Sequence, residues 1–255
     1  MKRIAKGLEP EGLLLFRERF PDRTWRQFKK FDKLRLRELQ QAIREQQGGL
    51  CAYCEIDLIP TRSSGAPDSR IEHFHPKSDS KGAHNWHLDW SNLFGCCHGG
   101  TRPNVAEAKH RFTSPDHSCD VPKGDKNLDH LILNPIDIPA FPPLFHVTRK
   151  GVMSVNEENC SQAKVDEKLA SGSIDHLRLN AQRLQRLRRA ELNAINQILR
   201  DLVAKGMTIE AAREKVAKGL LRKDKQGNWP KFFSTIRSYL GSAAEQQLEA
   251  LDYNG

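Results

Sequence analysis

The chain has 255 residues, a formal net charge of +9 and 38% hydrophobic residues, a composition that suits a globular protein of one large or two small domains. No window approaches the roughly 18 consecutive apolar residues of a membrane span, and the N-terminus MKRIAKGLEPEG lacks the apolar run of a signal peptide. We therefore expect no membrane association and a cytoplasmic location.

The charge is distributed unevenly along the chain. Residues 1–50 carry 13 Lys and Arg against 7 Asp and Glu, residues 51–135 carry 9 against 11, and residues 136–255 carry 19 against 14. A slightly acidic centre between basic flanks favours a protein that holds a cation in its middle and attracts phosphates with its flanks. Solvated helix faces on an ordinary basic protein are the alternative, which charge alone does not exclude.

Residues 10–47 are predicted to be helical, because hydrophobic residues recur at spacings of three and four. The stretch Phe20-Pro21-Asp22 predicts a break, Thr24 is a candidate N-cap for the second part, and Gly48-Gly49 is a candidate stop. The basic side chains of the second part are candidates for nucleic-acid contacts, with an ordinary solvated face as the alternative. They are Arg26, Lys29, Lys30, Lys33, Arg35 and Arg37.

Cys51 and Cys54 have the spacing with which zinc knuckles present two thiolates, although CxxC also serves redox chemistry. Six cysteines in a chain of this length favour metal ligands in a reducing compartment over a disulfide framework. The second pair must come from Cys96, Cys97 and Cys119. Because adjacent cysteines are hard to fit into one tetrahedron, one of Cys96 and Cys97 is expected to be a packed thiol. Four protein ligands leave no position for water, so this zinc would be structural.

The segment RIEHFHPKS predicts a short strand that ends at Glu72 and His73 and is closed by Pro76. A carboxylate oxygen suits a hard divalent ion such as Mg²⁺, and a neutral imidazole can take a proton from water near pH 7. A surface Glu-His pair is the alternative, but its position between the two halves of the cysteine set favours a functional site. His75 and Lys77 are candidate contacts to nucleic acid.

Asn92, in DWSNLF, is expected to fix a loop and to orient a neighbouring histidine, with an ordinary turn asparagine as the alternative. Asp120 follows the last cysteine of the segment, at the predicted start of a short helix. Its carboxylate would either reach an ion held by Glu72 or simply cap that helix. Lys123, one turn further, is expected to point towards phosphate.

Beyond this segment, residues 131–145 are apolar and punctuated by proline, which predicts extended chain wrapping the central module. Residues 145–155 predict a β-hairpin with a turn at Lys150-Gly151. No internal repeat or long low-complexity tract is present.

Helices are predicted from Gln162 onward, from Thr208 to Leu221, and from Phe232 to Leu251 with a break near Gly241. The residues that follow Asp175-His-Leu-Arg-Leu-Asn predict an amphipathic helix with a face rich in arginine. Solvation and docking to nucleic acid or to a partner are both open for that face. Its members are Arg183, Arg186, Arg188, Arg189 and Arg200.

Taken together, these motifs resemble the HNH nucleases of the ββα-metal class, which often carry CxxC, then Asp/Glu-His-xx-Pro, then Asn-Leu-xxx-Cys, then Cys-Asn-xx-Lys. The corresponding stretches here are Cys51-x-x-Cys54, Glu72-His73-Phe-His-Pro76, Asn92-Leu-Phe-Gly-Cys-Cys97 and Cys119-Asp120-Val-Pro-Lys123. More narrowly, CAYCE, IEHFHPKS, DWSNLF, SCDVPKG and HLRLNAQRLQRLR resemble the PtuB family. Members of that family are the HNH partners of an ABC-type ATPase in Septu anti-phage systems and in some retron operons. The resemblance covers roughly residues 1–200.

The resemblance implies an α+β fold, with a ββα-metal (HNH) core and a zinc knuckle flanked by N-terminal and C-terminal α-helices. It implies that His73 is the general base, that Asn92 orients it, and that Glu72 and Asp120 hold a catalytic Mg²⁺ or Mn²⁺. It also implies a structural Zn²⁺ on Cys51, Cys54, Cys97 and Cys119. This sequence departs from the common pattern in Glu72 for Asp, in Asp120 for Asn or His, and in the long segment between Cys97 and Cys119.

We therefore predict an HNH endonuclease in three parts: an N-terminal helical segment (1–50), a nuclease module with a zinc site (51–135), and an extended, hairpin and helical region (136–255). The expected partners are nucleic acid, with DNA favoured over tRNA, a PtuA-like ABC-type ATPase, and a retron reverse transcriptase with its nucleic acid. A zinc-dependent nucleic-acid-binding module, or an ATPase adaptor without catalysis, is the alternative. The co-occurrence of Glu72, His73, Asn92 and Asp120 favours the nuclease.

Overall fold

The computed structural model describes residues 1–58, 69–79, 82–101 and 116–255. The predicted helical stretch at the N-terminus is confirmed as three helices, α1 (Glu11–Arg19), α2 (Trp25–Phe31) and α3 (Lys33–Gln46). Thr24 caps α2 as predicted, because its side chain and that of Gln27 each accept a hydrogen bond from the other residue's backbone N–H. Asp32 begins α3 by capping two backbone N–H groups, a break that hydrophobic spacing did not reveal. Gly48 and Gly49 end α3 with positive φ angles.

The central part of the chain contains one two-stranded antiparallel sheet. Strand β1 (Arg70–His73) pairs with β2 (Leu93–Cys96), and the short 3-10 helix η1 (Trp90–Asn92) leads into β2. The register places Glu72 opposite Phe94 and His73 opposite Leu93. The short helix α5 (Asp120–Lys123) follows Cys119, as predicted. Most of the segment between Cys97 and Cys119 lies outside the described residues, which resume at 116.

The predicted hairpin is confirmed as β3 (Phe145–Val147) and β4 (Met153–Val155), and the helices α6 (Glu157–Gln162) and α7 (Glu167–His176) follow it. The remaining helices are α8 (Gln182–Ala204), α9 (Ile209–Leu220), α10 (Phe233–Leu240) and α11 (Ser242–Glu249). Thr208 caps α9, and Gly241 separates α10 from α11, as the sequence indicated. The coarse prediction of a mixed α+β fold is therefore confirmed.

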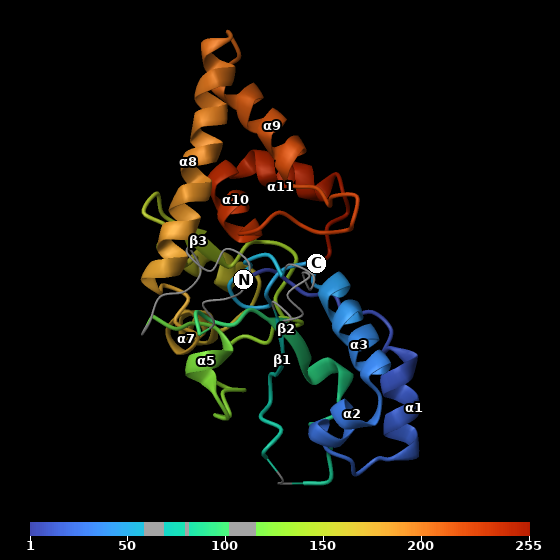
Figure 1. Ribbon diagram of the computed structural model, residues 1–255. Helices are drawn as coiled ribbons and strands as arrows, with labels where there is room; N and C mark the ends of the chain where they lie inside the picture. Colours follow the sequence, from blue (N-terminus) through green and yellow to red (C-terminus); the bar gives the residue numbers. More distant parts are fainter. Residues whose placement is uncertain (59–68, 80–81, 102–115) are drawn as a thin grey trace.

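The buried side chains form three hydrophobic clusters in the described part of the chain. The first cluster joins α1, α2 and α3 to the loop before β2, and the second joins the four helices α8, α9, α10 and α11. The third surrounds the cysteines and includes residues of the hairpin, α7 and α8. In Figure 1 the two helical groups lie at opposite ends of the molecule, with the β1–β2 pair and the hairpin between them. The central elements are thus held from both sides, which gives the side chains at the end of β1 a rigid frame.

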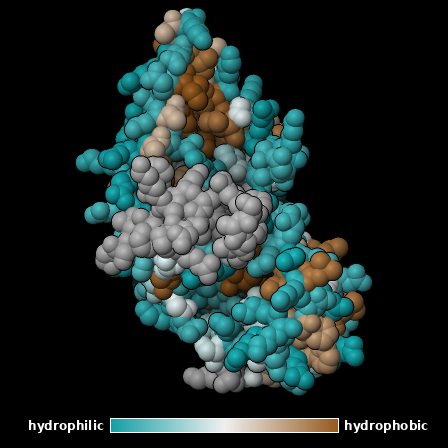
Figure 2. Space-filling view, in the orientation of Figure 1, coloured by the Kyte–Doolittle hydropathy of each residue, from teal (hydrophilic) through white to brown (hydrophobic). Residues whose placement is uncertain are grey.

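The arginine face of α8 is only partly the exposed surface that the sequence indicated. Arg186, Arg189 and Arg200 are exposed, whereas Arg183 and Arg188 are each only 1% exposed. The hydrophobic surface in Figure 2 gathers instead between α8 and α9, where Ile198, Val203 and Ile209 are exposed. None of the helices in the described residues is both long enough and apolar enough to cross a bilayer.

Candidate active site and metal centre

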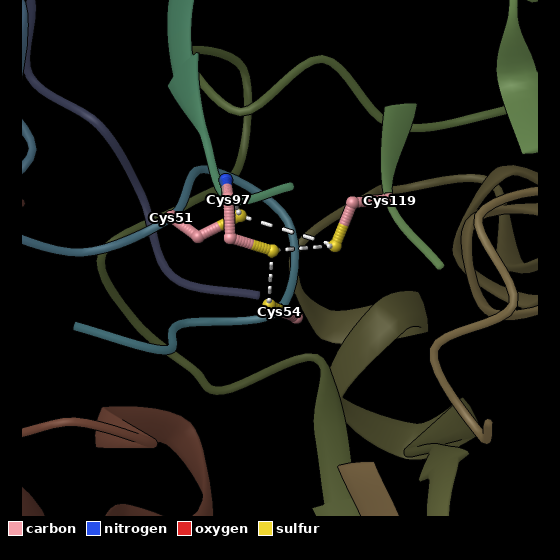
Figure 3. Close-up of side chains that lie close together, drawn as sticks. All are labelled: Cys51, Cys54, Cys97 and Cys119. Carbon is pink, nitrogen blue, oxygen red and sulfur yellow. Dashed lines mark hydrogen bonds between the residues drawn. The ribbon is translucent and has the colours of Figure 1, made fainter. Parts of the chain in front are cut away.

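Four cysteines from three separate segments meet in the centre of the molecule (Figure 3). Cys51 and Cys54 occupy the turn after α3, Cys97 directly follows β2, and Cys119 directly precedes α5. All four are buried. The Sγ atoms are separated by 3.9 Å for Cys51 and Cys119, 3.7 Å for Cys54 and Cys97, and 3.7 Å for Cys97 and Cys119.

This cluster has the size that a tetrahedral zinc ion requires. Zinc–sulfur bonds of about 2.3 Å in a tetrahedron place the sulfur atoms about 3.8 Å apart, and all four Sγ atoms here lie within 4.8 Å of one another. Backbone N–H groups of Cys97 and Gly99 point at the Sγ atoms of Cys51 and Cys97, at 3.4 Å each. Such contacts stabilise thiolates. Cys96 lies outside the group, on β2 opposite Arg70, so the geometry favours Cys97 over Cys96 as a metal ligand.

Glu72 and Lys123 form a buried ion pair beside this centre. The Lys123 ammonium lies 2.7 Å from Oε1 of Glu72 and donates a 3.0 Å hydrogen bond to the backbone carbonyl of His73. Burial raises the pKa of Glu72 to about 7, while the charge of Lys123 opposes that rise. Lys123 is 1% exposed. The expected phosphate contact by Lys123 is therefore wrong for this structure, because the ammonium is enclosed and already paired.

His73 is buried at the end of β1 with a fixed ring orientation. Its Nε2 lies 3.2 Å from the backbone carbonyl of His87, and its ring packs edge-on against Trp25 of α2 at 5.2 Å. A carbonyl oxygen only accepts, so Nε2 carries the proton and Nδ1 keeps its lone pair. Burial lowers the pKa of His73 to about 3. The imidazole is therefore neutral near pH 7, and its Nδ1 is in the form that accepts a proton from water.

Asn92 organises the loops around His73 rather than touching its ring. Its Oδ1 accepts from the backbone N–H of His75 at 2.7 Å, and its Nδ2 donates to the carbonyls of His75 and Trp86, at 3.0 and 2.9 Å. These bonds tie the end of β1 to the segment that carries the His87 carbonyl. The prediction that Asn92 orients the base therefore changes in one respect. The side chain of Asn92 bonds to backbone groups of His75 and Trp86, so it positions the His73 ring through the backbone of these loops.

Asp120, at the start of α5, is the second carboxylate beside β1. Its Oδ1 accepts a 2.6 Å hydrogen bond from Arg70, the first residue of β1. Burial raises the pKa of Asp120, and Arg70 opposes that rise. The charge of Asp120 also contributes to the raised pKa of Glu72, so the two carboxylates lie within electrostatic reach of each other. Through Lys123, α5 contacts both Glu72 and the backbone of His73.

His75 and Lys77 differ in how well they suit a contact to nucleic acid. His75 is 7% exposed, lies 2.6 Å from Asp129 and 3.3 Å from Asp79, and stacks on Trp86 at 3.9 Å. The expected phosphate contact by His75 is therefore wrong for this structure, since two carboxylates hold its ring. The side chain of Lys77 is 40% exposed, with its ammonium 3.8 Å from a carboxylate oxygen of Asp125. Lys77 remains a predicted nucleic-acid contact.

Three residues of the site were not singled out in the sequence. Trp25 packs on the base, His87 supplies the carbonyl that fixes it, and Arg70 pairs with Asp120. The ring of His87 also lies 6.5 Å from that of His73. Only Arg70, which begins the motif segment, carried a local signal. Trp25 and His87 reach His73 through tertiary contacts that no spacing rule describes.

Comparison with known proteins gives one clear relative. No family model matches the chain. A protein of Escherichia coli named "Retron Ec83 putative HNH endonuclease" is 33% identical over 260 aligned residues, which cover 94% of this chain and 93% of that protein. The similarity thus covers nearly the whole length of both chains.

Proposed function

Because this chain belongs to the HNH endonuclease family, and so to the phosphodiester hydrolases, we propose that it cuts DNA with His73 as general base and Glu72 and Asp120 as ligands of a divalent ion. The observation that carries the proposal is the state of His73. It is a buried, neutral imidazole whose protonated nitrogen is held by a carbonyl, at the end of the strand that also carries Glu72. A neutral imidazole with a free Nδ1 lone pair is the form of histidine that can accept a proton from water.

The two carboxylates fit Mg²⁺ or Mn²⁺ by their chemistry. Oxygen ligands suit these hard ions, and the present positive neighbours of Glu72 and Asp120 are Lys123 and Arg70. A divalent ion there would supply positive charge to the leaving oxygen of the phosphodiester. His73 takes the proton from water, and Asn92 keeps the loops that hold the ring in place. Lys77, on the exposed side, is the proposed contact to the nucleic-acid backbone.

The four cysteines fit a structural zinc ion, since their Sγ separations match a tetrahedron and four protein ligands leave no open coordination position. In this proposal zinc fixes Cys97, at the end of β2, and Cys119, before α5, to the turn after α3. The carboxylates and His73 therefore depend on zinc for their relative positions without touching it.

A role in anti-phage defence is the wider part of the proposal. It is supported by the PtuB-like motifs and by a relative whose name places it in a retron. We propose a PtuA-like ABC-type ATPase as the controlling partner, DNA rather than tRNA as the substrate, and a retron reverse transcriptase with its nucleic acid as a further partner. A zinc-dependent binding or adaptor module without catalysis is the alternative.

The test is cleavage by the purified protein with Mg²⁺ or Mn²⁺, with its ATPase added, on duplex DNA, single-stranded DNA and tRNA. His73→Ala should lower the cutting rate by about 10²- to 10⁴-fold, the usual contribution of a general base, with the same zinc content per chain. His176→Ala, a change at an exposed histidine of α7, should cut like the parent. Cutting by His73→Ala at the parent's rate would disprove the assignment of the base. Binding without cutting by the parent would favour the alternative.

A further inference from the structure

Two arginines of α8 are buried, and neither has an acidic ion-pair partner among the described residues. Arg183 and Arg188 are each 1% exposed, and neither forms an ion pair with a described residue. Buried guanidinium groups are costly unless a negative charge compensates them. A helix face that only packed against the core would be better served by leucine or methionine at these positions. The presence of Arg183 and Arg188 at these positions therefore indicates a buried negative charge nearby.

The hydrogen bonds of the two guanidinium groups go to neutral oxygens. Arg183 donates to the hydroxyl of Ser118 at 2.5 Å, and Arg188 donates to the carbonyls of Leu179 and Gly151, at 2.8 and 3.3 Å. Nε of Arg183 and one terminal nitrogen of Arg188 are buried with no hydrogen-bond partner in the described part of the chain. These neutral contacts orient both groups but do not balance their charge.

The cysteine cluster is the negative group that both arginines approach. The Ser118 hydroxyl that accepts from Arg183 lies 3.5 Å from Sγ of Cys119. Arg188 donates to the carbonyl of Leu179, two residues after Leu177, whose carbonyl accepts from the backbone N–H of Cys119. Consistent with that position, Cys54 and Cys119 oppose the lowering of the Arg188 pKa by burial. Glu55 acts on Arg188 in the same direction, but its carboxylate is already paired with the N-terminal ammonium of Met1, at 3.4 Å. The thiolates thus remain the uncompensated anions.

The charges of the two groups match. Four thiolates and one Zn²⁺ carry two net negative charges, and two guanidinium groups carry two positive charges. We propose that Arg183 and Arg188 are the counter-charges of the four-cysteine zinc centre and that they fasten α8 to it. The inference rests on the zinc ion of the proposed function and adds the residues that determine how tightly the ion is held. Outer residues of this kind commonly change metal affinity by about 10- to 100-fold.

Space filling and charge compensation, the two explanations for the buried arginines, predict different effects when Arg183 or Arg188 is substituted. If the arginines only fill space and bond to neutral oxygens, their loss should weaken zinc binding no more than any equal loss of stability. If they compensate the thiolates, removal of the charge should weaken zinc binding specifically, and lysine should restore part of it. Leu192 provides the matched control, since it is also on α8, 1% exposed, and apolar.

The experiment measures zinc per chain and the rate of zinc transfer to a chromogenic chelator, at temperatures where every variant is folded by circular dichroism. The variants are Arg183→Met, Arg188→Met, Arg183→Lys, Arg188→Lys and Leu192→Ala. We expect each methionine variant to release zinc at least about tenfold faster than the parent. Each lysine variant should lie between, and Leu192→Ala should release zinc at the parent's rate. Cobalt-loaded protein should show a shifted sulfur-to-metal charge-transfer band in the methionine variants only.

Equal release rates for parent and methionine variants would overturn the inference, and so would fast release from Leu192→Ala. If the methionine variants do not fold, the lysine variants carry the same comparison against Leu192→Ala. A parent protein that is purified folded but without zinc would instead refute the zinc ion of the proposed function, which makes the two failures distinguishable.

Discussion

At the scale of single residues, the pair of Glu72 and Lys123 shows how the site is held before any substrate arrives. Each ion has left water, and the 2.7 Å contact between them offsets that cost. Lys123 also bonds to the carbonyl of His73, so one ammonium group fixes the positions of the carboxylate and of the base. Arg70, at the other end of β1, fixes the carboxylate of Asp120 through a 2.6 Å hydrogen bond.

Lys123→Met tests this pair. The variant leaves Glu72 buried without a cation, and breaking such a pair from one side costs about 3–5 kcal/mol. Glu72→Gln removes the unpaired charge, so the double variant should be more stable than Lys123→Met alone. Urea denaturation of the parent, both single variants and the double variant measures the coupling. Additive losses in the free energy of unfolding would contradict a buried pair.

Lys6 illustrates a half-buried lysine whose side-chain contacts, among the described residues, are a backbone carbonyl and aromatic rings. It donates to the backbone carbonyl of Leu93 and lies 3.6 Å above the ring of Trp90. Burial lowers the pKa of Lys6 from 10.5 to about 7. As pH falls from 10.5 towards 7, the unfolded chain takes up a proton that the folded chain does not, so the folded state loses stability over this window.

Lys6→Met should remove that dependence. The unfolding free energy of the parent minus that of the variant should rise as pH increases from about 7 to 10.5, by up to about 1.4 kcal/mol per pH unit, and should be constant below pH 7. Urea denaturation at a series of pH values measures the difference. A difference that does not change with pH would show that Lys6 is not buried in this way.

At the scale of elements, the hairpin is fixed against α8 by a turn that only glycine suits. Gly151 has a φ of 81°, and a Cβ added there would lie 2.2 Å from the backbone oxygen of Gln185 in α8. Gly227 has a φ of 79° in another turn, where a Cβ would meet no atom within 4 Å. A residue with a side chain would be strained by the positive φ at either position, but only at position 151 would its Cβ also collide with a helix.

Gly151→Ala and Gly227→Ala should separate these effects. Both should lose about 1–2 kcal/mol from the left-handed backbone, and Gly151→Ala should lose a further 1–3 kcal/mol, roughly, because the methyl group meets the backbone of α8. Thermal and urea denaturation give the two values. If both variants lost the same stability, the close approach of the hairpin to α8 would be refuted.

At the scale of the whole molecule, the metal centre joins parts of the chain that lie far apart in sequence. Cys51 and Cys54 follow α3, and Cys97 follows β2. Cys119 precedes α5 and donates its backbone N–H to the carbonyl of Leu177, which follows α7. Metal binding at such a site is folding free energy, on the order of 10 kcal/mol for structural zinc.

Cys97→Ser and Cys54→Ser should therefore lose zinc and unfold the central module, whereas Cys96→Ser should keep one zinc ion per chain and melt close to the parent. The adjacent positions 96 and 97 make this a matched pair, because both thiols are buried and only Cys97 belongs to the cluster. Zinc content and thermal denaturation are the measurements. A zinc-free Cys97→Ser variant that melted normally would exclude a structural four-thiolate site.

The domain boundaries at residues 50 and 135 remain predictions.

The sequence by itself determined the features whose cause is local. Thr24, Thr208 and Gly241 set helix ends through bonds and backbone angles within a few residues, and the hairpin follows from its turn. The CxxC spacing likewise predicted that Cys51 and Cys54 lie together, whereas Cys97 and Cys119 were indicated by the family resemblance.

Only the tertiary structure decided which charged side chains are buried. Lys123, Arg183 and Arg188 look in sequence like surface cations, and all three are enclosed. Lys123 pairs with Glu72, Arg183 donates to Ser118, and Arg188 donates to backbone carbonyls, and the partners of Lys123 and Arg183 come from distant segments. The orientation of His73 likewise depends on a carbonyl fourteen residues away and on Trp25. A charged group reveals in sequence only its own charge, whereas its burial depends on whether the fold brings an opposite charge to meet it.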